Sequence, residues 1–323
     1  MVIVTGANGF IGSAMVWELN QAGVPVLATV DLVNREQRPG PLAKRKFQDF
    51  LLLEEFWKYL EKPETISKVT WIIHMGANSS TTETNEKLLW EVNTHCTQRI
   101  FEWCLKHKKN LIYASSAATY GAGELGYSDR MDHERLRPLN LYGESKVKFD
   151  RWAVQQKQTP PHWYGLKFFN VYGPNEYHKE GMTSVPLKAF HQIQETGKLK
   201  LFQSHNPDYR HGEQMRDFVY VKDVTRWMKE LMDKKPVSGI YNMGFGKART
   251  WNALGGSVFE SLKKPKSIEY IPVPENIRNQ YQYFTEADMS TWESIGMSKA
   301  QWSVEEGVKD YVTRYLLNED WYL

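Results

Sequence analysis

Apolar residues form short continuous runs in the first half of the chain, and stretches with helical spacing separate these runs. The runs cover residues 1–5, 24–30, 69–75, 110–115 and 163–170. Helical patterns lie between them, over residues 12–22, 52–60 and 85–107. Continuous apolar runs of this length are typical of strands that are buried on both faces of a sheet. The alternation predicts an α/β fold with a doubly wound parallel sheet.

The pattern changes after about residue 170, where Gly, Pro and polar residues become more frequent. The regular alternation of strand and helix patterns is lost there. The most polar stretch, residues 203–214, predicts a loop. Later elements are expected as strands over 240–243 and 268–271 and as helices over 251–263 and 304–317.

The length of 323 residues is compatible with about two domains, or with one large α/β unit and an added lobe. We assign residues 1–169 to a first domain, which also receives residues 216–245. Residues 170–323 mainly form a smaller, interleaved C-terminal lobe. The change of pattern near residue 170 is the basis of this division.

Charge and cysteine content exclude several classes of protein. A net charge of +3 is too balanced to indicate nucleic-acid binding, and the basic cluster at 106–109 is most simply an exposed helix end. Cys96 and Cys104 are eight residues apart on a predicted helix, about two turns, which is too far for a disulfide. The Cys and His residues show no zinc spacing, so we expect no metal. The chain shows no secretion signal and no long apolar run, which predicts a cytoplasmic protein without membrane contact.

A glycine-rich turn follows the first predicted strand and precedes the first predicted helix. It reads TGANGFIG over residues 5–12, with Gly6, Gly9 and Gly12 three residues apart. Such a turn lets backbone N–H groups approach a pyrophosphate at the positive end of the helix. In this context the turn predicts a dinucleotide site rather than a structural glycine turn.

Two features near the end of the second strand point to different dinucleotides. A carboxylate at Asp31 can accept hydrogen bonds from the adenine ribose hydroxyls, which favours NAD. Alternatively, Asp31 is a turn or capping residue. The basic residues that follow could instead hold the 2′-phosphate of NADP; they are Arg35, Arg38, Lys44 and Arg45. The residues alone leave NAD and NADP both open.

A second constellation carries proton chemistry. Ser116 lies in the segment SSAATYG at the end of a predicted strand, and Tyr142 and Lys146 follow with a spacing of four, on one face of a helix. Lys146 can lower the pKa of Tyr142 from its ordinary value of about 10, so that a phenolate accepts a proton at neutral pH. Ser116 can hydrogen-bond the same substrate oxygen. A Tyr–Lys pair at this spacing arises easily by chance, so its weight comes from the combination with the serine and glycine turns.

With these motifs the chain resembles the extended short-chain dehydrogenase/reductase superfamily, and within it the ADP-L-glycero-D-manno-heptose 6-epimerases. The broad resemblance is carried by TGANGFIG, SSAATYG, YGESK, FFNVYGP at 168–174 and RDFVYVKDV at 216–224. The narrower one is carried by HMGANSSTTE at 74–83, YASSAATYG, His178-Lys179, Tyr281-Gln282 and Phe284-Thr285. It covers nearly the whole chain and implies a Rossmann sheet.

The resemblance implies an isomerase that inverts C6 of the heptose in ADP-glycero-manno-heptose, for lipopolysaccharide inner-core precursors. It would use bound NADP, with transient oxidation to a ketone, and would assemble as a homo-oligomer, by resemblance a pentamer. Tyr142 and Lys179 would be the two acid/base groups, assisted by Ser116 and Lys146. The implied cofactor-binding residues are Gly6, Gly9, Phe10, Ile11, Gly12, Asp31, Leu32, Arg38, Gly76, Ala77, Asn78, Ser79, Asn93, Tyr142, Lys146 and Val171. The implied substrate-binding residues are Ser79, Ser116, Asn170, Lys179, Gly181, Lys188, Phe202, Arg216 and Tyr281.

Some positions depart from the family pattern. Gly181 stands where a serine is expected, Lys188 stands where a histidine is frequent, and the loop over 203–214 is longer than expected. Ala117 and Ala118 occupy the place where dehydratases of the superfamily carry an acidic pair, which argues against elimination chemistry. Two other readings stay open: a different nucleotide-sugar epimerase, for example one acting at C4 of a hexose, and a non-catalytic dinucleotide-sensing protein. Lys179 could also be an exposed loop lysine.

Overall fold

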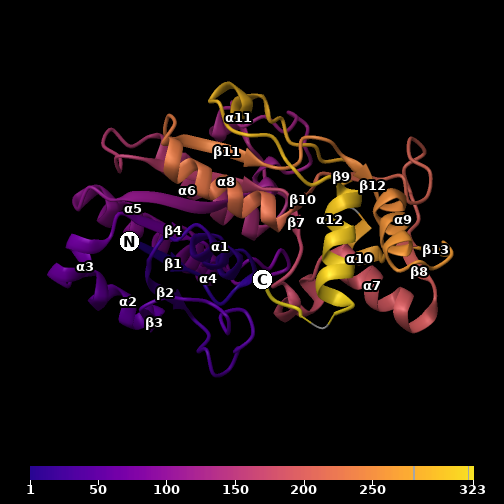
Figure 1. The fold of residues 1–323 in the computed structure, drawn as a ribbon. Helices are drawn as coiled ribbons and strands as arrows, with labels where there is room; N and C mark the ends of the chain where they lie inside the picture. The colour runs from indigo at the N-terminus through magenta and orange to yellow at the C-terminus, as the bar shows by residue number, and fades with distance from the viewer. Residues whose placement is uncertain (279–280, 319) are drawn as a thin grey trace.

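The computed structural model describes residues 1–278, 281–318 and 320–323. Its central sheet has seven strands in the order β11-β6-β5-β4-β1-β2-β3, and all neighbouring pairs are parallel. The strands are β1 (Val2–Thr5), β2 (Val26–Asp31), β3 (Asp49–Leu52), β4 (Trp71–His74), β5 (Asn110–Ser116), β6 (Trp163–Phe168) and β11 (Gly239–Met243). The predicted doubly wound parallel sheet is therefore confirmed (Figure 1).

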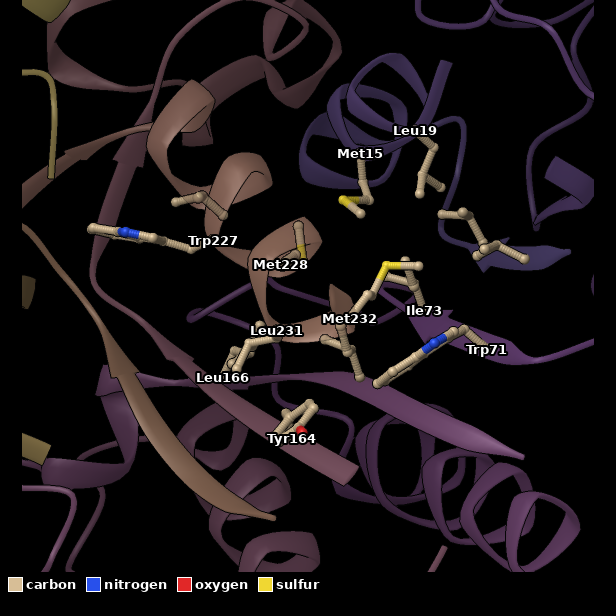
Figure 2. Close-up of a cluster of buried hydrophobic side chains, with 14 of the residues drawn as sticks. Met15, Leu19, Trp71, Ile73, Tyr164, Leu166, Trp227, Met228, Leu231 and Met232 are labelled. Atoms are coloured by element: carbon tan, nitrogen blue, oxygen red, sulfur yellow. The ribbon is translucent and has the colours of Figure 1, made fainter. Parts of the chain in front are cut away.

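Helices cover both faces of this sheet because successive strand residues point to opposite sides. The helices of this part are α1 (Phe10–Gln21), α2 (Leu53–Leu60), α3 (Pro63–Lys68), α4 (Glu86–Leu89), α5 (Cys96–Lys106), α6 (Leu141–Val154) and α8 (Val221–Lys234), with a π-helical turn at Trp90–His95. Figure 2 shows Met15 of α1 and Met228 of α8 packed over Ile73 of the sheet. On the other face, Ile3 packs in a cluster with Phe101 of α5.

The C-terminal part has its own apolar cluster, built from helices and short strand pairs. Its helices are α7 (Val185–Thr196), α9 (Trp251–Ser261), α10 (Glu275–Arg278), α11 (Ser290–Ser294) and α12 (Val304–Asp310), which continues as a π-helical turn over Tyr311–Leu316. The pairs are β7 (Asn170–Tyr172) with β10 (Phe218–Tyr220), β8 (Leu199–Phe202) with β13 (Ile268–Ile271), and β9 (Met215–Arg216) with β12 (Arg249–Thr250). Helices α7, α9 and α12 lie together beyond one end of the sheet (Figure 1).

The chain returns from this part to the sheet through α8 and β11. Gly239 pairs with Tyr164 and Met243 pairs with Phe168, so β11 lies parallel to β6 at the sheet edge. Trp227 and Leu231 of α8 then pack against the same apolar cluster as Leu166 of β6 (Figure 2). The last strand of the sheet is thus supplied by residues that follow the C-terminal insertion.

The structure differs from the sequence-based expectation at the other sheet edge. Residues 49–52 form β3, which the apolar pattern did not predict. Its side chains are exposed or half-buried because β3 is an edge strand, so it lacks the continuous apolar pattern of the inner strands. The expected loop over 203–214 contains no helix or strand, and it is held by Ser204 N donating to His211 Nδ1 at 3.0 Å and by Gln214 Nε2 donating to Phe202 O at 3.3 Å. Among the described helices, none is both long and apolar enough to span a bilayer.

Candidate active site

A cleft with a volume of about 960 Å³ opens at the carboxyl ends of the inner sheet strands. Thr5, Asp31, His74 and Ser116, the last residues of β1, β2, β4 and β5, all line it. Ligands of open α/β sheets bind at this edge, where the connections diverge. Further lining residues come from 178–179, 181–186 and 188 and from Trp251.

The glycine turn at the floor of this cleft depends on missing side chains. A Cβ on Gly6 would lie 2.5 Å from Gly76 N, and one on Gly12 would lie 2.1 Å from Gly6 O. Gly6 also has a φ of 61°, in the left-handed region. The turn therefore brings the N-terminal end of α1, with its unpaired N–H groups and positive dipole end, to the cleft. This arrangement fits the pyrophosphate of a dinucleotide.

Asp31 has the turn-fastening role that was one of its two sequence-based readings. It lines the cleft, and its carboxylate also accepts hydrogen bonds from the backbone N–H groups of Asn8, Leu32 and Val33 at 2.9, 2.8 and 3.1 Å. Arg38 lies in the cleft wall, with Nη1 donating to Asn8 O at 3.1 Å. The carboxylate is thus largely used in fastening the glycine turn to β2.

The resemblance implied that Asn78 and Asn93 contact the cofactor, but in the structure they hold the cleft loop in place instead. Neither is part of the cleft wall, whereas Gly76, Ala77 and Ser79 are. Asn93 is buried; it accepts a hydrogen bond from Asn78 N and donates to Asn78 O, each at 2.9 Å. Its Nδ2 also reaches Ser145 Oγ on α6 at 2.9 Å. Asn93 therefore ties the loop after β4 to the helix that carries Tyr142.

Ser116, Tyr142 and Lys146 come together in the cleft wall. Ser116 ends β5, and its Oγ accepts from Ala118 N at 3.1 Å, which caps the 3-10 turn at Ala117–Tyr120. Helix α6 begins after Asn140, whose side chain accepts from Gly143 N. The spacing of four then places Lys146 Nζ 6.0 Å from the centre of the Tyr142 ring.

The expected acidification of Tyr142 by Lys146 is wrong for the chain on its own. Burial raises the pKa of Tyr142, with hydrogen bonding by Ser116 acting in the opposite direction and the charge of Asp150 raising it further. Burial also lowers the pKa of Lys146 to about 8. Its ammonium group donates to Ala114 O at 3.0 Å. The physical reason is that burial removes part of the hydration of both side chains, and this disfavours the phenolate of Tyr142 and the ammonium of Lys146.

A buried ionic network below the serine turn was missed in the sequence. Asp150 accepts from Ser115 Oγ at 2.6 Å and from Tyr113 OH at 3.0 Å, and it pairs with Lys167 Nζ at 2.7 Å. Lys167 also donates to Thr119 Oγ1 at 2.7 Å. Asp150 lies one helical turn after Lys146, a spacing that could have indicated a shared helix face, but the partner on β6 could not be read from spacing.

Lys179 also lines the cleft, within the 3-10 turn at Tyr177–Met182. Its Nζ is 5.2 Å from the centre of the Phe10 ring at the start of α1. Burial lowers the pKa of Lys179 and the Lys188 charge adds to this, whereas the Glu176 carboxylate raises it. The fully buried Glu176 carboxylate accepts from Ser184 Oγ at 2.6 Å, which closes the loop that carries Lys179. The reading of Lys179 as a freely exposed lysine is thus excluded.

The remaining implied substrate residues divide into two groups. Asn170, Gly181 and Lys188 line the cleft, as does the implied cofactor residue Val171. Phe202, Arg216 and Tyr281 do not; they form a cluster beyond Trp251.

In that cluster the Arg216 guanidinium carbon is 5.7 Å from the centre of the Trp251 ring and 5.5 Å from that of Tyr281. Trp251 and Phe218 are cleft residues that the sequence reasoning did not single out. Among the described residues, no three or more His, Cys, Asp or Glu side chains are grouped so that they could hold a metal ion.

Known proteins are similar to this chain in sequence. Residues 2–244 match the model of the Epimerase family, described as the NAD dependent epimerase/dehydratase family. The chain is 44% identical, over all of both chains, to a protein of Fusobacterium nucleatum named ADP-L-glycero-D-manno-heptose-6-epimerase. It is also 44% identical to the protein of that name from Nitratidesulfovibrio vulgaris, over 99% of each chain.

Solved structures of related proteins have the same fold. The crystal structure of Helicobacter pylori ADP-L-glycero-D-manno-heptose-6-epimerase superposes with a TM-score of 0.76 at 26% identity, covering 97% of this chain and 95% of that one. The fold is also that of a Thermotoga maritima UDP-glucose 4-epimerase, with a TM-score of 0.78 at 22% identity over 98% and 99% of the two chains. The resemblance inferred from the motifs is confirmed, and the chain belongs to the NAD dependent epimerase/dehydratase family.

Proposed function

We propose that this nicotinamide-dependent nucleotide-sugar epimerase inverts C6 of the heptose in ADP-glycero-manno-heptose, with NADP as its retained dinucleotide. The observation that carries the proposal is the presence of Tyr142 and Lys179, on different elements, in the walls of one cleft. Two acid/base groups suit a reaction in which a carbon must be approached from two faces. The names of the full-length relatives support the choice of sugar.

The chain's own groups divide the proton chemistry between them. In the chain on its own, burial raises the pKa of Tyr142, so Tyr142 accepts the proton of the C6 hydroxyl only as a phenolate, a form that the positive charge of an oxidised nicotinamide ring would favour. Ser116 hydrogen-bonds the same oxygen. The bound dinucleotide supplies the hydride acceptor and, on return, the hydride donor. C6 becomes a planar ketone and, because it lies outside the sugar ring, rotation about its bond to the ring presents the other face. The hydride then returns to that other face while Lys179 gives a proton to the oxygen. Because the hydride returns, no net oxidation occurs, and exchange with solvent removes the proton from Tyr142 and restores the one on Lys179.

NADP is favoured over NAD by the environment of the second strand. Three backbone N–H groups already occupy the Asp31 carboxylate, which leaves it less able to accept from ribose hydroxyls. Arg38 lies in the cleft wall and offers a guanidinium group to a phosphate. Mass spectrometry of the dinucleotide released from the purified chain distinguishes the two.

We also propose which segments bind each ligand, where the enzyme acts and how the chain assembles. Residues 1–169 with 216–245 would bind the dinucleotide, and most of residues 170–323 would bind the sugar nucleotide. The chain would act in the cytoplasm, and its product would serve lipopolysaccharide inner-core synthesis. The chain would also form a homo-oligomer. Native mass spectrometry tests this, with a pentamer as the first state to look for.

The substrate is tested by incubating the purified chain with ADP-glycero-manno-heptose and, in parallel, with UDP-galactose. Proton NMR should show conversion to the C6 epimer of the heptose. In D₂O the C6 hydrogen should be retained, because it leaves and returns as hydride. Conversion of UDP-galactose without conversion of the heptose would show a C4 epimerase instead.

A further inference from the structure

Asn175 lies just before the turn that carries Lys179, and both ends of its side-chain amide are used. It is fully buried and does not line the cleft. Its Nδ2 donates to Ser13 Oγ on α1 at 2.9 Å, and its Oδ1 accepts from Leu323 N at 2.9 Å. Its φ of 81° lies in the left-handed region, where a glycine would cost less. The amide therefore supplies contacts that a glycine at this position could not make.

The contact with Ser13 connects Asn175 to the glycine turn. Ser13 is buried in α1, and its Oγ donates to Gly9 O at 2.6 Å. Gly9 is one of the residues that line the cleft. In the other direction, Glu176 follows Asn175 in the chain, and its carbonyl oxygen accepts from Lys179 N at 3.1 Å. Few bonds thus separate the backbone of Lys179 from the glycine turn, and the Asn175 amide lies in the middle of them.

Residues 320–323 pack against the first residue of the same 3-10 turn, Tyr177. The centre of the Tyr177 ring is 5.0 Å from that of Trp321 and 5.5 Å from that of Tyr322, and both rings meet it edge-on. None of these four described residues lines the cleft. They can therefore act on Lys179 only through the turn that carries it.

Residues 320–323 are also held by the loop after β2, in the N-terminal part of the chain (Figure 1). Arg45 of that loop donates from Nη2 to Leu323 O. Tyr322 lies against Gly40, where an added Cβ would be 2.2 Å from the ring carbon Cζ of Tyr322. The short segment therefore joins this loop to the 3-10 turn of the cleft wall.

We propose that Asn175 and residues 320–323 form a clamp that positions Lys179 for its proton transfer. They are positioning residues, because they hold the turn and do not line the cleft. Lysine has a long, flexible side chain, so the placement of the Lys179 ammonium group depends on the backbone that carries it. A displacement of about 1 Å at a reacting group can lower a rate by about 100-fold. This inference rests on the proposed acid/base role of Lys179 and names the residues on which that role depends.

The two C6 epimers of ADP-glycero-manno-heptose report on the two acid/base groups separately. With one epimer Tyr142 removes the hydroxyl proton while the C6 hydrogen leaves as hydride, and with the other epimer Lys179 removes it. Each half-reaction reduces the bound dinucleotide, so stopped-flow absorbance of the reduced nicotinamide follows it in a single turnover. Tyr142→Phe and Lys179→Met show which epimer depends on which group.

Asn175→Gly removes the amide and leaves a residue that adopts the left-handed backbone without strain. It should slow the half-reaction that depends on Lys179 by about tenfold or more, and leave the one that depends on Tyr142 within about twofold of the wild type. Lys235→Gly is the matched control, because Lys235 is exposed, has a φ of 48° and does not line the cleft. It should change neither half-reaction.

Equal slowing of both half-reactions by Asn175→Gly, or normal rates in both, would overturn the proposal. If this variant folds poorly, Trp321→Ala tests the clamp from its other end, with the same selectivity expected. A wild type that reacts with neither epimer, or a Lys179→Met variant that slows neither half-reaction, contradicts the proposed function instead. Hydrogen exchange of the dinucleotide-bound chain then decides on the clamp. Faster exchange confined to residues 175–184 in the variants supports it, and unchanged or uniformly faster exchange overturns it.

Discussion

Asp150 of α6 and Lys167 of β6 form a 2.7 Å ion pair in which both side chains are fully buried. The pair joins the helix of Tyr142 and Lys146 to the strand beside the serine turn. Replacement of one partner leaves the other charge desolvated and unpaired, which is far more costly than loss of a surface pair.

Lys167→Met should therefore lower the free energy of unfolding by about 3–5 kcal/mol, measured by urea unfolding. Lys229→Met removes a similar contact, to Asp233 at 2.6 Å, where the Asp233 side chain is 62% exposed. That control should cost less than about 1 kcal/mol. If both variants lost the same free energy of unfolding, the buried pair would contribute no more than the surface pair, which contradicts the prediction.

Lys146 should be a position where stability and activity oppose each other. Its folded-state pKa of about 8 lies below the ordinary value of 10.5, so the folded chain disfavours the ammonium form. At pH 7 this costs about 3 kcal/mol, offset by about 1 kcal/mol for the hydrogen bond to Ala114 O. Lys146→Met should therefore raise the free energy of unfolding at pH 7 by about 2 kcal/mol, measured by urea unfolding. The same variant should lose turnover.

The difference in stability between Lys146→Met and the wild type should depend on pH. Between about pH 8 and 10.5 the unfolded chain binds more protons at Lys146 than the folded chain, so the wild type gains stability as the pH rises through this window. The advantage of Lys146→Met should shrink accordingly. Lys58→Met, at an exposed position on α2, should show no such trend. An advantage that grows with pH would be incompatible with a depressed pKa.

Gly12→Ala should impair dinucleotide binding by a factor of ten or more, about 1.4 kcal/mol. The added Cβ would lie 2.1 Å from Gly6 O, so the turn must shift. Gly256→Ala is the control, because its Cβ would meet only Lys266 Nζ at 3.8 Å in helix α9. That change should leave binding unchanged and raise stability by about 0.5–1 kcal/mol. Titration calorimetry and melting measure both.

Tyr142→Phe should retain the dinucleotide and lose about 10²–10⁴-fold in turnover, since general acid–base catalysis contributes this much. The change removes only the hydroxyl, so the ring still packs in the cleft. Tyr241→Phe, which loses a hydrogen bond to Val237 O away from the cleft, should keep its activity. Near-normal turnover of Tyr142→Phe would remove Tyr142 from the mechanism.

The sequence predicted the parts of the site whose geometry is local. The glycine turn and the Tyr142–Lys146 spacing are set within one element, and they lie where the pattern placed them. Contacts between distant segments were not accessible. Asn93 supports Asn78 from within the π-helical turn, and Arg216 and Tyr281 meet beside Trp251 only because the C-terminal strands pair. The pKa of Tyr142 also depends on desolvation, which spacing does not report.

The late return of the chain to the sheet has a consequence for its assembly. A fragment ending at residue 169 would lack β11 and α8, so the backbone groups of β6 that pair with β11 would be open to other chains. Tyr164 and Leu166 would lose the cover that α8 provides. Such a fragment is expected to aggregate, and during synthesis the sheet can close only after residue 243 has left the ribosome.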